Sequence, residues 1–328
     1  MKKNKMGKIS FLICTYNSPK LIKRCLNSII AQNYEGTKEI IIVDGGSDRE
    51  TLEVLESFRK KFRNIVKIFN NKKRLPEGYG KGKWLGWKKC TGEVVFIVDQ
   101  DNEFQGEENI HEMLKPFEKE EVFGVACRLM LKHEDNLTNQ YVALVGTDPF
   151  MAYKSLDGLI NLKKIGEDKG GYTLIEIKKE NLMITGGNCF AYRKSYLDSV
   201  GGYVQDTENI AKLVEIGKNK VGVPKKAFTH HSAVAGFLDF IKKKKKWARA
   251  YSPAKGKFSY MPASKDEMRK LIISLFFTFA VFPNIYIAFK QTVKSGEKAW
   301  ILHPVLSFIT GFIYFFYTFL RIKIFPAN

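Results

Sequence analysis

Short, continuous apolar runs alternate with helix-like segments over the first 100 residues of the chain. Continuous apolar runs are typical of strands buried on both faces of a parallel sheet. The segments between them carry apolar residues at helical spacing, and the first follows Ser18-Pro19, a pair suited to begin a helix. The predicted strands are 9–14, 39–43, 65–69 and 94–98. The first predicted helix begins at Pro19, and the other two cover 51–62 and 83–90.

This alternation predicts an α/β fold with a Rossmann-like, mostly parallel sheet. In such sheets, ligands bind beyond the carboxyl ends of the strands. Polar or acidic clusters follow three of the predicted strands, and they are Thr15-Tyr16-Asn17, Asp44-Gly45-Gly46-Ser47 and Asp99-Gln100-Asp101. We therefore expect the three clusters to line one cleft.

Asp99 and Asp101 place two carboxylates one residue apart at the end of a buried strand, where they repel each other. A divalent cation relieves this repulsion, and oxygen ligands suit Mg²⁺ or Mn²⁺, which leave positions for phosphate oxygens. Such a cation would neutralise the charge of a departing diphosphate. The glycine-rich segment 78–83 contains Lys81 and Lys83, which we expect to contact phosphates. Acid pairs are also common at turns, so the pair alone does not establish a metal site.

The order of these motifs resembles that of the family 2 glycosyltransferases, which have the GT-A fold. The segments that carry the resemblance are ISFLICTYN, EIIIVDGGS, GEVVFIVDQDNEF, TGGNCFAYR from Thr185 and VGGY from Val200. Gln205-Asp206 then stands in the place of the family's Glu-Asp pair, and His230-His231 and a basic run ending at Trp247 follow. The resemblance covers about residues 8–250.

The resemblance implies a role for each matching residue. The residues expected to bind the nucleotide-sugar donor are Thr15, Tyr16, Asn17, Asp44, Lys81, Lys83 and Asp99. Those expected to hold the metal are Asp99, Asp101 and His231, with His230 as the alternative histidine. Those expected on the acceptor side are Gly187, Asn188 and Trp247. Asp206 would be the catalytic base, which takes the proton of an acceptor hydroxyl while that oxygen attacks the anomeric carbon with inversion.

Three departures from the family pattern bear on the expected chemistry. Gly45 stands where a second acid often follows the second strand, so the identity of the nucleotide is left open. Gln205 replaces the Glu that precedes the expected base. The Q-x-x-R-W motif of processive synthases is represented only by four lysines and Trp247, so processive synthesis is not expected.

The C-terminal region is both basic and apolar. The chain has a net charge of +20, and residues 236–328 hold 16 Lys and Arg against 4 Asp and Glu. Two uncharged apolar stretches, 271–289 and 300–320, are each long enough to cross roughly 30 Å of hydrocarbon as a helix. Basic residues flank the pair, so we expect a transmembrane hairpin with both ends in the cytoplasm. Two buried core helices are the alternative.

These features predict three parts: a GT-A domain at 1–235, a basic amphipathic membrane-interface segment at 236–268 and a transmembrane hairpin at 269–328. The lysines of 242–246 are expected to contact anionic membrane lipids, although a solvated charge run gives the same pattern. No nucleic-acid-binding module accompanies the run, so nucleic acid is not an expected partner. Five scattered cysteines suit a reducing compartment, and the first apolar run is a poor signal peptide.

The sequence thus predicts an inverting, metal-dependent glycosyltransferase attached to the cell membrane, with its catalytic domain in the cytoplasm. The expected donor is a nucleotide-diphosphate sugar, and the expected acceptor is a lipid-linked or envelope glycan. A polyprenyl-phosphate glycosyltransferase is the enzymatic alternative, because such enzymes often combine a similar domain with two spans. A non-catalytic membrane-surface scaffold that keeps the fold is the alternative of a different class.

Overall fold

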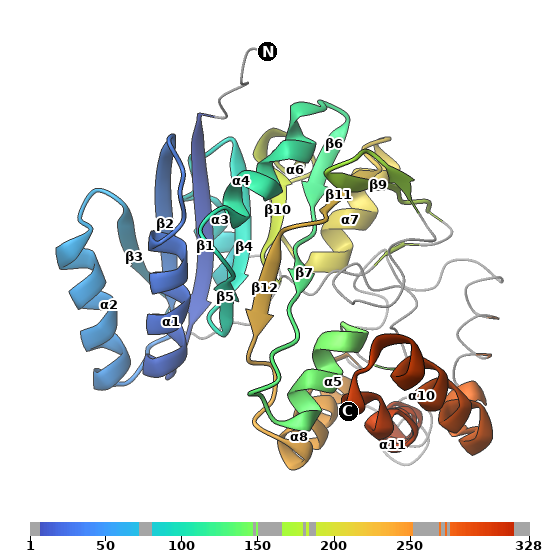
Figure 1. Cartoon of the computed structure of the whole chain (residues 1–328). Coiled ribbons are helices and arrows are strands. Elements are labelled where there is room, and N and C mark those ends of the chain that lie inside the picture. Colours follow the sequence, from blue (N-terminus) through green and yellow to red (C-terminus); the bar gives the residue numbers. More distant parts are fainter. Residues whose placement is uncertain are drawn as a thin grey trace, which may run out of the picture.

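A nine-stranded sheet forms the centre of the computed structural model, which describes residues 7–71, 81–146, 149, 166–179, 182–183, 188–251, 269, 273 and 276–317 (Figure 1). The strand order is β3-β2-β1-β4-β10-β6-β11-β9-β8. Strands β9 and β10 run antiparallel to their neighbours, and the others share one direction, so the mostly parallel sheet is confirmed. The strands are β1 Lys8–Thr15, β2 Thr37–Asp44, β3 Val66–Asn70, β4 Val94–Asp99, β6 Val122–Val125, β8 Glu167–Asp168, β9 Tyr172–Glu176, β10 Phe190–Arg193 and β11 Lys220–Pro224.

Helices cover both faces of this sheet, as the continuous apolar strands require. Phe11 of β1 lies in one core with α1, α2 and α4, whereas the next residue, Leu12, lies in a second core with α3, α6 and α7. The first set of helices is α1 Pro19–Ile30, α2 Arg49–Lys61 and α4 Asn109–Leu114, which the 3-10 helix η1 Lys115–Glu118 continues. The second set is α3 Gly82–Trp87, α6 Lys194–Ser199 and α7 Asp206–Glu215.

A small second sheet brings a distant part of the chain to the end of β4. Its strand order is β5-β12-β7, with bounds β5 Asn102–Phe104, β12 Phe228–His231 and β7 Arg128–Leu129. Strand β5 begins three residues after Asp99 and is antiparallel to β12, with Asn102 opposite His231 and Glu103 opposite His230. The two histidines of β12 therefore lie beside the acidic loop.

The C-terminal helices form a separate layer below the sheet in Figure 1. A third apolar core, which includes Tyr141, Phe240 and Trp300, packs these helices against α5 Leu137–Val145. The other elements of this layer are α8 Phe237–Tyr251, α10 Val281–Ser295, the 3-10 helix η5 Lys298–Leu302 and α11 His303–Phe315.

The first of the two expected membrane spans differs from the prediction. Its described residues are helical at 276–279 and again from Val281, with a break at Ala280. Helix α10 then continues past Phe289 to Ser295 and includes Lys290 and Lys294. Within the part of the chain that the structure describes, one helical segment, Lys298–Phe315, is long and apolar enough to cross a membrane. The two-span hairpin is therefore not confirmed, and the three-part division of the chain stays a prediction.

The buried carboxylate of Glu39 holds the edges of three strands together. Glu39 lies on β2 and is 1% exposed. Its oxygens accept hydrogen bonds from the Ser10 hydroxyl at 2.7 Å and the Thr91 amide at 2.6 Å. Lys8 and Lys67 pair with it at 2.8 and 3.1 Å. Burial acts to raise the pKa of Glu39, but the bonds to Lys8, Thr91 and Ser10 outweigh it and lower this pKa to about 2.

We expect Glu39→Gln to lower the free energy of unfolding at neutral pH by about 2–4 kcal/mol, because it removes a charged acceptor from several buried donors. The folded-state pKa lies below the unfolded value. The contribution is therefore complete above about pH 4.5 and disappears as the pH falls through about 2. Denaturant unfolding of both proteins in detergent, from pH 7 to pH 2.5, measures this. A difference that stays constant down to pH 2.5 would contradict the assignment.

Candidate active site

The acidic loop after β4 is held by neighbouring elements. The Asn102 side-chain oxygen accepts from the Asp99 amide at 3.2 Å, and the carbonyl of Asp101 accepts from Ser232, just after β12, at 3.0 Å. Gln100 is held by the end of β1. Its side-chain oxygen accepts hydrogen bonds from the Thr15 hydroxyl at 2.7 Å and from the Tyr16 amide at 3.1 Å. The ends of β1 and β4 thus meet, as the sequence predicts.

Lys83 of α3 reaches the first carboxylate of this loop. Its Nζ lies 3.1 Å from Asp99 Oδ1 and 5.8 Å from the ring centre of Tyr203, and the residue is 8% exposed. Burial raises the pKa of Asp99, and the Lys83 ammonium opposes this shift. A cation at this point favours a negatively charged ligand beside Asp99, which suits the expected contact with phosphates.

The second carboxylate of the loop faces His231 of β12. His231 Nε2 lies 3.5 Å from Asp101 Oδ2. Burial acts to lower the pKa of His231, but Asp101 outweighs it and raises this pKa, while His231 lowers the pKa of Asp101 against the effect of burial. The other ring nitrogen, Nδ1, is buried, and no residue that the structure describes bonds to it.

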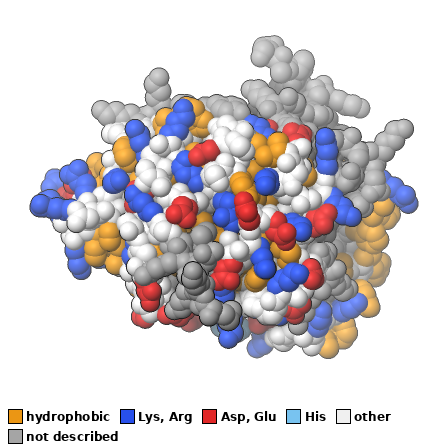
Figure 2. Space-filling model, turned by 90° about the horizontal axis from the view of Figure 1, so that it is seen from above, with side chains coloured by type: hydrophobic (Ala, Val, Ile, Leu, Met, Phe, Trp, Pro, Cys, Tyr) orange, Lys and Arg blue, Asp and Glu red, His pale blue; other side chains and the backbone are white. Residues whose placement is uncertain are grey.

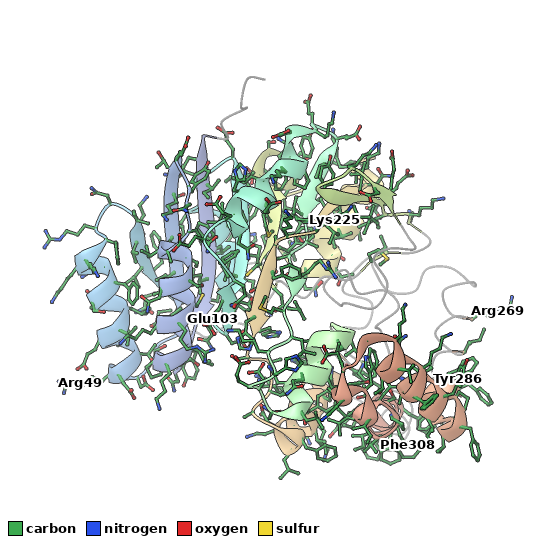
Figure 3. The ribbon with its side chains drawn as sticks, viewed as in Figure 1. Arg49, Glu103, Lys225, Arg269, Tyr286 and Phe308 are labelled. Atoms are coloured by element: carbon green, nitrogen blue, oxygen red, sulfur yellow. The ribbon has the colours of Figure 1, made fainter. Side chains whose placement is uncertain are left out.

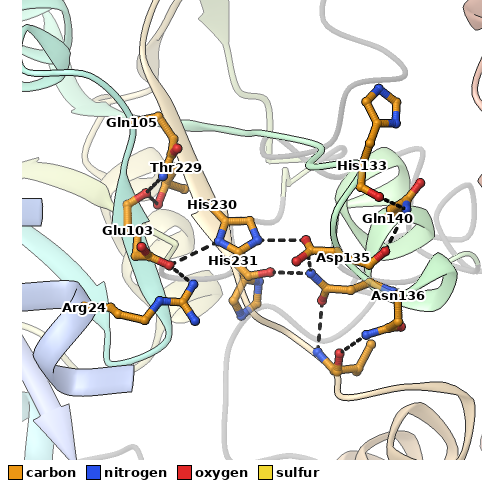
Figure 4. A network of polar contacts seen from close by, with 12 residues as sticks. Arg24, Glu103, Gln105, His133, Asp135, Asn136, Gln140, Thr229, His230 and His231 are labelled. Carbon is orange, nitrogen blue, oxygen red and sulfur yellow. Dashed lines mark hydrogen bonds and ion pairs between the residues drawn. The ribbon is translucent and has the colours of Figure 1, made fainter. Parts of the chain in front are cut away.

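His230 points into a different network (Figure 4). Its Nε2 lies 2.8 Å from Asp135 Oδ2 and its Nδ1 3.3 Å from Glu103 Oε1, and Glu103 also pairs with Arg24 of α1. Asp135 and the His231 carbonyl both accept from Asn139 of α5, at 2.8 and 3.0 Å. His230 therefore joins α1, β5 and α5, and the structure favours His231 over His230 as a metal ligand.

The donor atoms at this edge suit a divalent cation, although the ligand set is not assembled. The two carboxylates match the preference of Mg²⁺ and Mn²⁺ for oxygen ligands. The imidazole of His231 adds a buried ring nitrogen to which no described residue bonds. Among the described residues, no three His, Cys, Asp or Glu side chains are grouped closely enough to hold a metal ion. Asp99 instead faces Lys83.

We expect His231→Ala to weaken Mn²⁺ binding at least tenfold, because it removes the imidazole beside Asp101. The matched variant His230→Ala is expected to lower the melting temperature and leave Mn²⁺ affinity near that of the wild type, because its bonds go to Glu103 and Asp135. Calorimetric titration with MnCl₂ and thermal unfolding separate the two effects. Equal loss of Mn²⁺ affinity in both variants would refute the assignment.

Asp206, the expected catalytic base, is the first residue of α7. It is 8% exposed, and the hydroxyl of Tyr203 donates to its Oδ1. Gln205 caps the helix, since its side-chain oxygen accepts from the Glu208 amide at 3.0 Å. Burial raises the pKa of Asp206, and the charge of Asp99 adds to this rise. The Lys83 ammonium and the hydrogen bond from Tyr203 act in the opposite direction. Asp206 thus lies within electrostatic reach of the groups expected at the donor diphosphate.

Packed aromatic rings hold α3, which carries Lys83, close to α7, which begins at Asp206. The ring of Trp87, at the end of α3, lies 6.3 Å from those of Tyr203 and Tyr192. The Trp87 indole donates to Asp198 of α6 at 2.7 Å. Because these rings are buried, they fix Lys83 and Asp206 on rigid elements.

The turn after β2 lies beside the end of β1, where the nucleotide is expected. The Asp44 carboxylate accepts from the amides of Gly46 at 3.0 Å and Ser47 at 3.2 Å. Asn17 has a φ of 44°, and its side chain accepts from Asp48 at 2.8 Å. Lys81, the N-cap residue of α3, is half-buried two positions before Lys83. Asp44 and Asn17 thus shape the backbone of this turn.

The three residues expected on the acceptor side have different positions. Asn188 is 4% exposed, and its side-chain oxygen accepts from Asn102 at 3.3 Å, which connects it to the acidic loop. Gly187 lies outside the described residues. Trp247 lies on α8 and is 48% exposed, with its ring 4.5 Å from Lys244 Nζ.

Three residues of the site were not singled out as functional from the sequence. Gln100 and Asn102 fix the acidic loop, and Tyr203 binds Asp206. Gln100 and Asn102 flank Asp101 in the sequence, so a search for side chains that satisfy the loop's backbone groups would have found them. The Tyr203 contact depends on how α7 packs and has no local sequence signal.

Comparisons with known proteins identify the family to which this chain belongs. The family model described as "Glycosyl transferase family 2" matches residues 10–201, more than half of the chain. The poly(ribitol-phosphate) beta-N-acetylglucosaminyltransferase TarS of Staphylococcus aureus is 35% identical over 98 residues, which cover 30% of this chain and 17% of that protein. A dolichyl N-acetyl-alpha-D-glucosaminyl phosphate 3-beta-D-2,3-diacetamido-2,3-dideoxy-beta-D-glucuronosyltransferase of Methanococcus voltae is 43% identical over 95 residues, which cover 28% of each chain. The matches thus span less than a third of either relative.

Solved structures show the fold. The mannosyltransferase PcManGT from Pyrobaculum calidifontis, in complex with GDP-Man and Mn²⁺, matches with a TM-score of 0.57 and 14% identity, over 97% of this chain and 88% of that one. A structure of GalNAc-T7 with UDP, GalNAc and Mn²⁺ matches with a TM-score of 0.52 and 16% identity, over 82% of this chain and 54% of that one. These likenesses support the GT-A type of α/β fold. With the family model covering residues 10–201, the chain belongs to glycosyl transferase family 2, a family of enzymes.

Proposed function

We propose that this protein transfers a sugar from a nucleoside-diphosphate donor to a hydroxyl of a glycan or lipid-linked acceptor, with inversion at the anomeric carbon. The observation that carries the proposal is Asp206. A buried carboxylate with a raised pKa, bound by Tyr203, lies within electrostatic reach of Lys83 and Asp99. A general base beside a diphosphate-binding edge is what attack by a neutral hydroxyl requires.

The donor would lie across the ends of β1, β2 and β4. The amides and side chains of the two turns after β1 and β2 would contact the nucleoside, and Lys83 would contact the diphosphate beside Asp99. A divalent cation held by Asp99, Asp101 and His231 would supply positive charge to the departing diphosphate. Mn²⁺ in PcManGT and GalNAc-T7 supports this choice of cofactor.

In the proposed reaction, Asp206 accepts the proton of the acceptor hydroxyl as its oxygen forms a bond to the anomeric carbon. The bond from that carbon to the diphosphate breaks on the opposite face, and the electron pair leaves with the nucleoside diphosphate. Tyr203 orients the Asp206 carboxylate by its hydrogen bond. The buried rings of Trp87 and Tyr192 exclude water from the far side of Tyr203.

The need for a base favours a hydroxyl acceptor over a polyprenyl phosphate. A phosphate monoester is already ionised near neutral pH and attacks without losing a proton to the enzyme. The names of TarS and of the Methanococcus voltae enzyme, which refer to poly(ribitol-phosphate) and to a dolichyl-linked sugar, support a glycan or lipid-linked acceptor. We further propose that the C-terminal layer attaches the catalytic domain to the cytoplasmic face of the membrane.

Donor binding tests this function directly. The full chain in detergent is titrated by calorimetry with uridine, guanosine and thymidine diphosphate sugars, with and without Mn²⁺. We expect Mn²⁺-dependent binding of one donor, lost in Asp101→Asn and retained in Asp168→Asn, an exposed carboxylate on the edge strand β8. Donor binding that is independent of Mn²⁺ and unchanged in Asp101→Asn would refute the proposed donor site. No donor binding at all would favour a non-catalytic scaffold.

A further inference from the structure

The outer side of the C-terminal layer is apolar. Phe282 and Phe289 of α10 are 85% and 68% exposed, and Tyr286 and Phe308 lie on the outer side of the helices, away from the sheet (Figure 3). The exposed apolar residues recur every three or four positions, so each helix presents one continuous stripe. These residues are Val281, Phe282, Ile285, Tyr286, Phe289 and Val293 of α10, and Ile301, Val305, Phe308 and Phe312 of η5 and α11.

Two polar side chains of the same helices, Asn284 and His303, point inward. Asn284 is 4% exposed and donates to the carbonyls of Phe277, Thr278 and Ala280 at the helix break. His303 Nδ1 lies 2.7 Å from the Tyr141 hydroxyl of α5. This is the reverse of the pattern of a helix that faces water. Hydrophobic side chains also gather at the right-hand margin of the view in Figure 2, whereas basic and acidic side chains are mixed over the rest of that face. A surface of this kind is normally covered by lipid or by another protein.

Helix α8 indicates how a bilayer would meet this surface. It lies along α11, because Phe240 packs in one core with Trp300 and Leu306, and Ala248 in another with Ile313 and Tyr317. Arg249 Nε also donates to the Tyr317 hydroxyl at 2.9 Å. The side of α8 that faces away from α11 carries a basic stripe made of Lys242, Lys245 and Lys246, all exposed.

This arrangement opposes a spanning hairpin. If α11 crossed the bilayer, the basic stripe beside it would enter the hydrocarbon, which charged side chains strongly disfavour. Helix α10 has 15 residues and is about 22 Å long, shorter than the hydrocarbon core, and Lys290 and Lys294 lie on its exposed side.

We propose that α8, α10 and α11 form a platform that lies in the plane of one leaflet of an anionic bilayer, without crossing it. The apolar stripes of α10 and α11 enter the interface, and the basic stripe of α8 contacts anionic headgroups. Anionic lipid is the occupant that the charge of α8 favours over a second copy of this basic chain. The inference rests on the C-terminal helices and does not depend on the transferase activity.

Chemical labelling of the segment between α10 and α11 distinguishes a platform that lies in one leaflet from a hairpin that spans the bilayer. Ser295 is exposed at the end of α10, and Ser199 is exposed on α6 of the catalytic domain. Ser295→Cys and Ser199→Cys are introduced singly into the full chain, and a membrane-impermeant maleimide is applied to inside-out vesicles and to spheroplasts. We expect both cysteines to react in the same preparation, above the background of the unsubstituted protein. Reaction of position 295 from the side opposite to position 199 would overturn the proposal.

Vesicle binding tests the occupant. We expect Phe282→Glu combined with Phe289→Glu to weaken binding to vesicles of phosphatidylcholine with 30% phosphatidylglycerol at least tenfold. The control Ile216→Glu changes a 50% exposed apolar residue at the end of α7 and is expected to bind as the wild type does. Melting temperatures check that each variant is folded. Unchanged vesicle binding of the double variant would overturn the proposal. A wild type that self-associates in detergent through these residues, with no effect of the double substitution on lipid binding, would also overturn it.

Discussion

Asp206→Asn is expected to lower the rate of sugar transfer by about 10²–10⁴, the usual contribution of a positioned general base. The amide has nearly the same size and still accepts the Tyr203 hydrogen bond, so the packing around α7 should be kept. The variant removes the group that accepts the acceptor's proton and leaves Lys83, Asp99 and Asp101 in place. Donor affinity should therefore stay close to that of the wild type.

Two measurements check this expectation: the initial rate of transfer with the donor found by calorimetry, and the dissociation constant of that donor. The matched control is Glu215→Gln, which removes an exposed carboxylate from the other end of α7. Full activity in Asp206→Asn would exclude Asp206 as the base. A parallel loss of donor affinity would mean that its carboxylate serves the donor site instead.

Lys83→Met is expected to lower transfer at pH 7 by at least about 100-fold and to shift its pH dependence. Burial already raises the pKa of Asp206, and the Lys83 ammonium opposes that rise. Without this cation the pKa of Asp206 rises further, so a larger fraction of the base is protonated and inactive at pH 7. The acid limb of kcat/KM therefore moves to higher pH, and part of the lost activity returns as the pH is raised.

The same variant leaves Asp99 without its 3.1 Å partner, so donor affinity should also fall. Lys89→Met, which removes an exposed lysine just after α3, is the control and should leave the pH profile unchanged. Profiles of kcat/KM from pH 5 to pH 9 make the comparison. A loss of activity with no movement of the acid limb would place the role of Lys83 entirely at the donor.

The sequence predicts the parts of this protein whose structure follows from local pattern. The four strands expected before residue 100 all form, with ends that differ by at most two residues. For β1, β2 and β4 the reason is a continuous apolar run that is buried in the sheet core, whereas β3 is a half-buried edge strand. The same runs place the loops after β1 and β4 together, which Thr15 and Gln100 confirm by direct contact. The family follows from the order of motifs that lie in these loops.

Contacts that depend on tertiary packing could not be predicted in this way. Adjacent histidines on a strand point to opposite faces, and only the pairing of β12 with β5 determines which of them meets Asp101. The ion pair of Lys83 and Asp99 depends on the position of α3 against the sheet. In the C-terminal region, hydropathy alone does not distinguish a membrane span from a helix packed on α5 and α8, since both are apolar.

The place of β10 in the sheet affects how the chain folds during synthesis. Strand β4 pairs with β1 on one edge, and its other edge is covered by β10, which is made about 90 residues later. At ribosomal rates this interval lasts about 5–18 s, during which the apolar edge of β4 has no native partner. An unpaired edge of this kind is a site for pairing with other chains. The nascent protein thus passes through a period of aggregation risk that ends when β10 joins the two halves of the sheet.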